Sequence, residues 1–178
     1  NIILSKLRDY LFKIDLPNFL LSTAGIGFDS MLHFYQSKKI QNPEFSKALV
    51  EILDLPAQLG LPYVVSCDED FSSKFKNEYK RGVTLTNCGF YGPQGRVLRI
   101  PLQDPTLNEK INSFNYKGQK ITNLEMETAG IYGLSKLLGH RAVSLNAIIA
   151  NRANGKFSTQ PAKTVDLLIQ SALNCMVS

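Results

Sequence analysis

Short β-rich runs alternate with segments of helical pattern along the whole chain, and this alternation most constrains the fold. Alternating strands and helices are typical of an α/β layered domain. We therefore predict one α/β domain over residues 1–178, with a central mixed β-sheet flanked by helices. The β-rich runs lie at 18–28, 63–68, 82–88 and 140–152, and the helical patterns at 42–60, 69–79, 121–140 and 158–177.

Residues that favour helix ends support two of these helices. Asn42 fits an N-cap and is followed by a proline at the first helical position. Thr122, with Glu125 three residues later, forms a capping box, and Asn123 is an alternative cap. Gly139 follows the last apolar pair of that segment, as a C′ glycine does. We therefore expect helices that begin near Asn42 and near Thr122.

The ends of other elements are set less firmly by the pattern. Residues 1–12 place Ile3, Leu7 and Leu11 at helical spacing, but the stretch is short and leaves helix and strand open. Residues 96–100 are expected to continue as a strand after the loop that precedes them. The last helix is expected to bury an apolar face made of Val165, Leu168, Ile169 and Leu173.

Charge and cysteine content narrow the class of protein. The net charge is +5 from 20 basic and 15 acidic residues, and the basic residues are scattered. Nucleic-acid and membrane surfaces usually concentrate such charge, so we expect neither partner, whereas a small anion such as phosphate suits the excess. The three cysteines show no metal-ligand spacing, which favours three buried thiols in a reducing cytoplasm and no metal site. No apolar run is long enough for a membrane span, and no signal peptide is evident.

Residues 89–96, "GFYGPQGR", combine turn-forming glycines with groups that recognise ligands. Phe90 or Tyr91 offers a ring that stacks on a planar heterocycle. Gln94 carries an acceptor and two donors, and Arg96 carries a fixed fork of donors. This set matches a flat ring with adjacent carbonyl and N–H groups, and uracil presents that pattern. The alternative is a surface turn whose rings pack inward and whose Gln and Arg are solvated.

Two further stretches carry polar groups beside small or apolar residues. In "NLEMETAG" (123–130), Glu127 precedes small residues that allow a ligand to approach, so its carboxylate suits a vicinal diol while Met126 packs on the sugar. The alternative is that the acidic residues only favour a helix dipole. In "AIIANRANG" (147–155), an apolar strand ends at polar residues, which in α/β proteins often line a crevice. A solvated strand exit is the alternative there.

These stretches together resemble the nucleoside phosphorylase family, and within it the uridine phosphorylases. "FYGPQGR", "NLEMETAG" and "IIANRANG" follow one another in the family's order, and "GIGFDSMLHFY" (25–35) is also similar. The resemblance covers the chain from about Ile14 to its end. It implies that Phe90 stacks near the base and that Gln94 and Arg96 hold the edge of uracil.

The resemblance also implies the remaining site residues. Met126 and Glu127 match the ribose-binding pair, Ile148 and Ile149 wall the base pocket, and Arg152 follows an Asn where purine-specific relatives carry an Asp. Arg96 and Glu127 are the expected catalytic residues. The implied reaction is phosphorolysis of uridine to uracil and ribose 1-phosphate, with inorganic phosphate as co-substrate, no cofactor, and a dimer-based homo-oligomer.

One part of the family pattern is missing. The family's glycine-rich phosphate loop precedes the matching region, and "ILSKLRDYL" stands where relatives carry a glycine- and threonine-rich strand. Three explanations are open: the chain is a fragment, it is a relative that binds uracil or uridine without turnover, or another chain or residue supplies the anion site. Loss of backbone N–H groups in such a loop removes most of the expected phosphate site.

Overall fold

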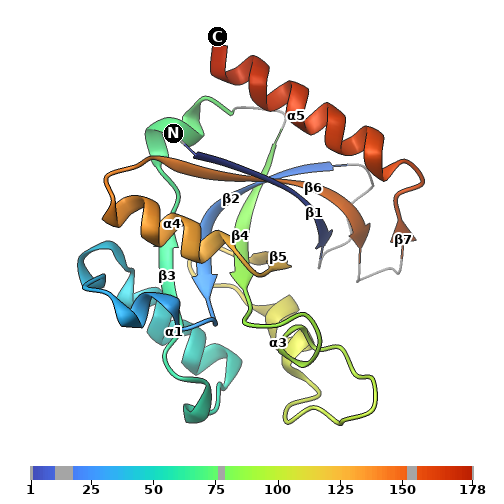
Figure 1. Cartoon of the computed structure of the whole chain (residues 1–178). Coiled ribbons are helices and arrows are strands. Elements are labelled where there is room, and N and C mark those ends of the chain that lie inside the picture. The colour runs from blue at the N-terminus through green and yellow to red at the C-terminus, as the bar shows by residue number, and fades with distance from the viewer. Residues whose placement is uncertain (1, 11–17, 76–78, 152–155, 178) are drawn as a thin grey trace.

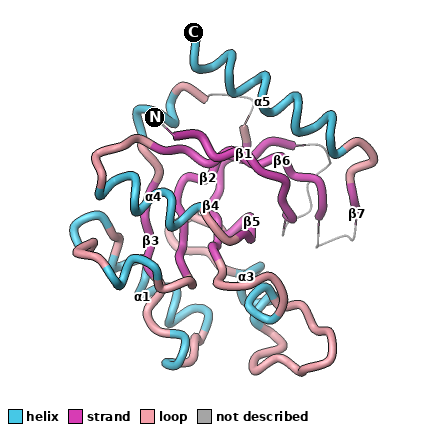
Figure 2. Tube along the Cα trace, viewed as in Figure 1, coloured by secondary structure: helices cyan, strands magenta, loops and turns pink. Residues whose placement is uncertain are grey.

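The structure, a computed structural model, describes residues 2–10, 18–75, 79–151 and 156–177. They form a curled, seven-stranded mixed sheet with helices packed around it, as Figure 1 shows, so the predicted α/β layered fold is confirmed. The strands are β1 (Ile2–Tyr10), β2 (Asn18–Gly27), β3 (Tyr63–Ser66), β4 (Lys80–Thr86), β5 (Ile121–Glu125), β6 (Ala142–Asn151) and β7 (Lys156–Phe157). The helices are α1 (Pro43–Leu53), α2 (Glu69–Ser73), α3 (Leu107–Ser113), α4 (Thr128–Leu137) and α5 (Pro161–Val177), and loops join them as Figure 2 shows.

Five strands of the sheet close on themselves into a barrel. The strand order is β3-β2-β4-β5-β1-β6-β7, and β6 pairs a second time with β2. β4 is parallel to both β2 and β5, while β1 is antiparallel to β5 and parallel to β6. Closure leaves these five strands without a free edge, which removes the tendency of exposed edges to pair with other chains.

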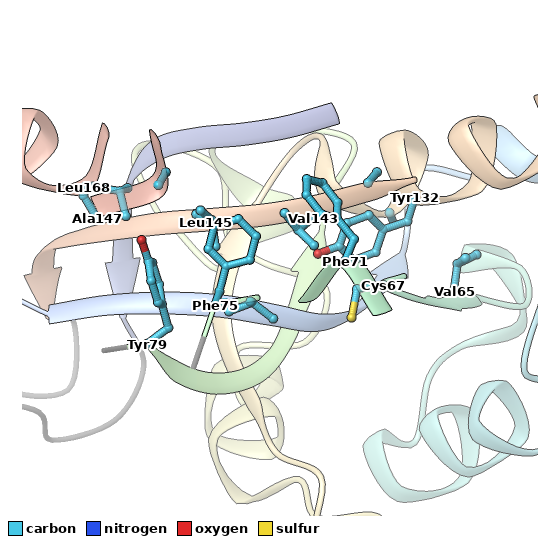
Figure 3. Close-up of a cluster of buried hydrophobic side chains, with 14 of the residues drawn as sticks. Val65, Cys67, Phe71, Phe75, Tyr79, Tyr132, Val143, Leu145, Ala147 and Leu168 are labelled. Atoms are coloured by element: carbon cyan, nitrogen blue, oxygen red, sulfur yellow. The ribbon is translucent and has the colours of Figure 1, made fainter. Parts of the chain in front are cut away.

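Two apolar clusters hold the helices against the sheet. In the first, Phe71, Phe75 and Tyr132 pack against Val143 and Leu145 of β6, as Figure 3 shows. The second lies under α1 and α3 and includes a stacked ring pair whose centroids are 5.8 Å apart. The residues of that pair are Phe45 and Phe114.

The predicted boundary at Asn42 is confirmed, and so is the glycine at the end of α4. The Asn42 side chain accepts from Phe45 N–H at 3.0 Å, at the start of α1. Gly139 has a φ of 72° and donates to Lys136 O at 3.2 Å, while the next residue donates to Ser135 O at 2.7 Å. This pair of bonds is a Schellman motif, which the left-handed glycine permits.

The predicted capping box at Thr122 and Glu125 is wrong. Residues 121–125 form strand β5, in which every residue is buried, and α4 begins only at Thr128. β5 lies between β4 and β1, which pair with its two edges, and Ile121 and Leu124 pack in the apolar cluster under α1 and α3. A short, fully buried strand lacks the alternation that separates strand from helix in a sequence.

Three other boundaries differ from expectation. The opening stretch is strand β1, because it extends the barrel between β5 and β6. The strand expected at 96–100 is wrong: residues 97–100 are exposed and pair with no described strand. The buried face of α5 is rotated from the predicted one. Leu168 is buried as expected, but Ile169 and Leu173 are exposed, and Thr164 and Ala172 are buried instead.

Candidate functional site

The register between β4 and β5 brings the two main predicted segments to one edge of the sheet. The two strands are parallel, and Thr86 at the end of β4 pairs with Glu125 at the end of β5. The loop 87–96 and the pair Met126–Glu127 therefore leave the sheet side by side. Polar groups gathered at the carboxyl ends of parallel strands are a common place for ligand sites in α/β proteins.

The loop holds its aromatic and guanidinium groups together. Arg96 Nε donates to Phe90 O at 3.1 Å, and Arg96 Cζ lies 3.9 Å from the centroid of the Phe90 ring. That position is favourable for a cation–π interaction. The Phe90 and Tyr91 rings meet edge to face at 5.3 Å and are 49% and 55% exposed, so both remain open to a planar ligand.

Gln94 differs from its neighbours because it is buried. It is the last residue of a short 3-10 turn, and only 4% of it is exposed. Asn108 of α3 donates to Gln94 O at 3.4 Å, which ties the loop to that helix. The loop thus departs from the surface-turn alternative, in which the rings would be buried and the amide solvated.

A buried carboxylate fixes the second segment. Glu125 accepts from Glu127 N–H at 3.0 Å, from Thr128 N–H at 2.8 Å and from the Thr128 hydroxyl at 2.9 Å. The Thr86 hydroxyl also donates to it, from the neighbouring strand. Glu125 therefore satisfies N–H groups at the start of α4, groups that have no partner within a helix. Met126 and Glu127 are held by it at the sheet edge, exposed and half-buried respectively.

Glu125 and Glu127 were predicted to lie on a helix, with Glu125 as the second member of a capping box. Both the helical position and the capping-box role are wrong. Glu125 ends a strand, and Glu127 occupies the N-cap position of α4. A signal was present in the sequence, since a carboxylate just before a helix start can serve as its cap. The false capping box hid that signal by moving the expected helix start to Thr122.

The barrel interior behind this edge is polar and continuous with Glu125. The Ser22 and Thr84 hydroxyls lie 2.6 Å apart, and Asn146 Nδ2 donates to Ser22 Oγ at 3.1 Å. Asn146 Nδ2 also lies 3.3 Å from the oxygen of Ser144, whose hydroxyl is 3.0 Å from that of Thr128. Thr128 donates to Glu125, so side chains from three strands and one helix support the site edge. The network is not fully satisfied, because Asn146 Oδ1 is buried without a hydrogen-bond partner among the described residues.

The two predicted isoleucines lie across β1 from Glu125. Asp9 of β1 pairs with Leu124 on one side and with Ala150 on the other. Ile148 and Ile149 directly precede Ala150, so their backbone lies two strand spacings, about 10 Å, from the end of β5. Ile148 is buried and Ile149 partly exposed. Arg152 lies outside the described residues.

The predicted site residues line neither of two hollows that the described residues form. These cavities, of about 510 and 250 Å³, lie elsewhere, around Arg81. The described site residues of the loop 89–96 and of the pair Met126–Glu127 lie on two segments that leave one edge of the sheet. The expected burial of all three thiols is wrong, because Cys67 is buried but Cys88 is exposed and Cys175 is half-buried. Within the described part of the chain no group of three or more metal-ligating side chains occurs, and no helix is long and apolar enough to cross a membrane.

The sequence comparison and the structure comparison return proteins of the same kind. No protein-family profile matches the chain. Uridine phosphorylase of Thermococcus kodakarensis is 31% identical over 104 residues, which are 55% of this chain and 35% of that protein. The chain thus matches about a third of the length of this curated relative.

Two solved structures share the fold. A Trypanosoma brucei nucleoside phosphorylase described as showing uridine phosphorylase activity aligns with a TM-score of 0.77 and 20% identity, over 98% of this chain and 62% of that one. Isoform 2 of uridine phosphorylase from Schistosoma mansoni, in complex with citrate, aligns at 0.63 and 20%, over 98% and 59%. The fold is therefore that of the nucleoside phosphorylases. The sequence match and the shared fold support the resemblance to nucleoside phosphorylases that the motifs indicated.

Proposed function

We propose that this chain provides the nucleoside-binding side of a uridine phosphorylase. The observation that carries the proposal is the pairing of Thr86 with Glu125, which sets the loop of Phe90 and Arg96 beside Met126–Glu127. A ring, a donor fork and a carboxylate on one edge suit a pyrimidine with a sugar attached. Uridine phosphorylase relatives in sequence and fold support the same substrate.

Each side chain has a role in this proposal. Phe90 stacks on uracil while Gln94 and Arg96 meet its polar edge. Met126 packs on the ribose and Glu127 accepts from its hydroxyls. The apolar wall of the base pocket comes from Ile148 and Ile149, and Arg152 completes the polar end of the pocket.

The proposed reaction is phosphorolysis, with inorganic phosphate as co-substrate and no cofactor. A phosphate oxygen forms a bond to the anomeric carbon while the bond from that carbon to uracil breaks and its electron pair leaves with the base. Arg96 donates to the uracil edge, where negative charge develops, and such a fixed donor stabilises the transition state. Glu127 holds the ribose in place, and loss of that orientation lowers the rate steeply.

A second candidate function is binding of uracil or uridine without turnover. The strand β1 favours it, because residues 2–10 pair continuously along β6 with one register shift. Backbone N–H groups engaged in such a ladder do not form the cradle that glycine-rich loops offer to phosphate. Under this alternative the sheet edge formed by residues 87–96 and 126–127, the nucleoside edge, still binds the nucleoside. The reaction with phosphate is lost.

The test measures binding and turnover on the same protein. Calorimetry reports binding of uridine and uracil, and chromatography reports phosphate-dependent release of uracil. Glu127→Gln is expected to lower kcat/KM about 100-fold or more, by analogy with the loss of a positioned polar contact. Glu51→Gln, an exposed glutamate of α1, is the matched control and should leave the rate unchanged. Binding without uracil release supports the second function, and no binding at all refutes both.

We further propose that the protein acts in the cytoplasm as a dimer-based homo-oligomer. Apolar side chains are exposed close in sequence to the site, and grouped exposed apolar residues often mark contacts between proteins. They are Val97, Leu98 and Ile100, of which Ile100 is 80% exposed. Sedimentation of the chain should give a species heavier than the monomer, and a Leu98→Glu change should shift it toward the monomer. A parent that sediments only as a monomer contradicts this assembly.

A further inference from the structure

A polar cavity lies at the end of the barrel away from the nucleoside edge. It has a volume of about 510 Å³ and is lined by residues that include Thr23, Ser66, Glu69, Arg81 and Gln119. A smaller cavity of about 250 Å³ shares three of these residues and adds Lys120 and Thr122. The five residues of β4 between its Arg81 and its end span about 17 Å, so this cavity is separate from the proposed nucleoside site.

Arg81 gives the cavity a fixed positive charge. Its Nη2 donates to Ser72 O at 3.1 Å and to Phe75 O at 3.4 Å, which anchors the guanidinium over the end of α2. Among the described residues no acidic side chain forms an ion pair with it, and its side chain is exposed. The remaining N–H groups of the fork are therefore available to an anion, and a guanidinium fork matches phosphate oxygens.

Two irregularities in the sheet place threonines beside the cavities, and both threonine hydroxyls are bound to β4: Thr23 donates to Gly82 O at 3.2 Å and Thr122 donates to Val83 O at 3.3 Å. The register between β2 and β4 shifts at Thr23, and the register between β4 and β5 shifts at Thr122. Both threonines line the cavities, on either side of Gly82 and Val83 of β4. β-bulges re-aim side chains and are over-represented near binding sites.

We propose that this cavity is a second ligand site, for a phosphorylated sugar. Arg81 and Lys120 would face the phosphate, and the side-chain amide of Gln119 would donate to its oxygens. Glu69 lies on the same wall and accepts from sugar hydroxyls. The volume falls in the range of about 300–1,000 Å³ that is usual for small-molecule sites. The site lies too far from Phe90 and Glu127 to supply the phosphate of the proposed phosphorolysis, so it is an addition to that function.

The test uses calorimetry on the full chain with ribose 5-phosphate, and with ribose and inorganic phosphate as separate probes. Ribose 5-phosphate should bind more tightly than phosphate, and ribose should not bind measurably. Arg81→Gln should weaken ribose 5-phosphate binding about tenfold or more, because a charged donor to phosphate is lost. Lys80→Gln removes the same charge from the adjacent, exposed residue outside the cavity, and should change the affinity less than twofold.

A second variant covers the chance that Arg81→Gln disturbs α2. Ser66→Asp adds a negative charge to the cavity wall without touching the contacts of Arg81, and it should weaken binding by a similar factor. Hydrogen exchange of the parent should show protection by ribose 5-phosphate in residues 66–73 and 80–83. Glu127→Gln should leave that protection intact, which separates this site from the nucleoside edge. The proposal would be overturned if both cavity variants bound ribose 5-phosphate as tightly as the parent, or if the parent did not bind it. It would also be overturned if ribose 5-phosphate protected only residues 87–96 from hydrogen exchange.

Discussion

The carboxylate of Glu125 accepts a hydrogen bond at 3.0 Å from the backbone N–H of Glu127, so the last residue of β5 holds the N-cap residue of α4 in place. The same carboxylate receives the hydroxyl of Thr86 at the end of β4. One buried acid thus joins the two segments that form the nucleoside edge. A negative charge at this position also interacts favourably with the amino-terminal end of the α4 dipole.

Glu125→Gln should destabilise the protein, because an amide offers one acceptor oxygen and adds donors where the site already supplies donors. Hydrogen bonds to a charged group contribute about 1.5–3 kcal/mol, so we expect the free energy of unfolding to fall by about 2–3 kcal/mol. Urea denaturation followed by circular dichroism measures this, with Glu51→Gln as an exposed control. A parent-like midpoint for Glu125→Gln would show that the four donors do not depend on the charge.

Gly25→Ala tests how closely β2 approaches α4. A Cβ at Gly25 would lie 2.7 Å from Ala129 Cα and 2.8 Å from Ala129 N, and neither backbone atom can move without shifting the helix. Such overpacking costs about 1–3 kcal/mol. Thermal unfolding should show a lower Tm and, since α4 starts beside Glu127, weaker binding of uridine.

Gly92→Ala is the matched control for that change. A Cβ at Gly92 would have its nearest neighbour, Leu102 Cδ2, at 3.7 Å, which is an ordinary contact. Its Tm should stay close to that of the parent. Equal Tm values for both alanine variants would mean that the contact between β2 and α4 is looser than the structure shows.

Tyr132→Phe tests the polar link between α4 and the barrel. The Tyr132 hydroxyl donates to Ser22 O at 2.6 Å and accepts from Ser144 N–H at 2.8 Å. Removing it leaves a buried carbonyl and a buried N–H without this partner, at a cost of about 1–3 kcal/mol. Tyr35→Phe, at an exposed tyrosine, should cost almost nothing in the same denaturation measurement. A loss in Tyr132→Phe no larger than in this control would contradict the link.

The sequence predicted the fold class, the site segments and most element positions, and its errors share one physical cause. β2 and β4 were found because their runs are rich in β-branched and apolar residues bounded by turns. β5 was missed because all five of its residues are buried and a Thr-x-x-Glu spacing imitated a cap. Local pattern cannot report which neighbours cover a strand, and this one is covered by the apolar cluster under α1 and α3 and by the buried polar groups of the barrel.

The same limit applies to the site. The motifs indicated Phe90, Arg96 and Glu127, because rings, guanidinium groups and carboxylates in glycine-rich surroundings suggest ligands. They did not indicate the register between Thr86 and Glu125, which places the two segments side by side. Arg81 was also missed, since its position over a cavity depends on two bulges that no local pattern marks.

Asp68 predicts how stability depends on pH. Its carboxylate accepts from Phe71 N–H at 2.7 Å at the start of α2 and from Arg141 Nε at 3.0 Å. Partial burial opposes the charged form, but the hydrogen bond from Phe71 and the Arg141 guanidinium outweigh it and lower the pKa of Asp68. A carboxylate with a lowered pKa in the folded state stabilises the protein above its unfolded pKa of about 3.9, and that stabilisation is lost as the pH falls through the folded pKa.

Asp68→Asn keeps an acceptor for the α2 cap and removes only the charge. Because the pair with Arg141 is partly exposed and screened by solvent, we expect the variant to be less stable than the parent by about 0.3–1 kcal/mol near pH 7. The two proteins should converge at acid pH below the folded pKa of Asp68, where the parent side chain is protonated as well. Urea denaturation across this range measures the difference. A gap that stays constant down to the lowest pH would show that the charge of Asp68 contributes nothing and that the substitution acts through packing alone.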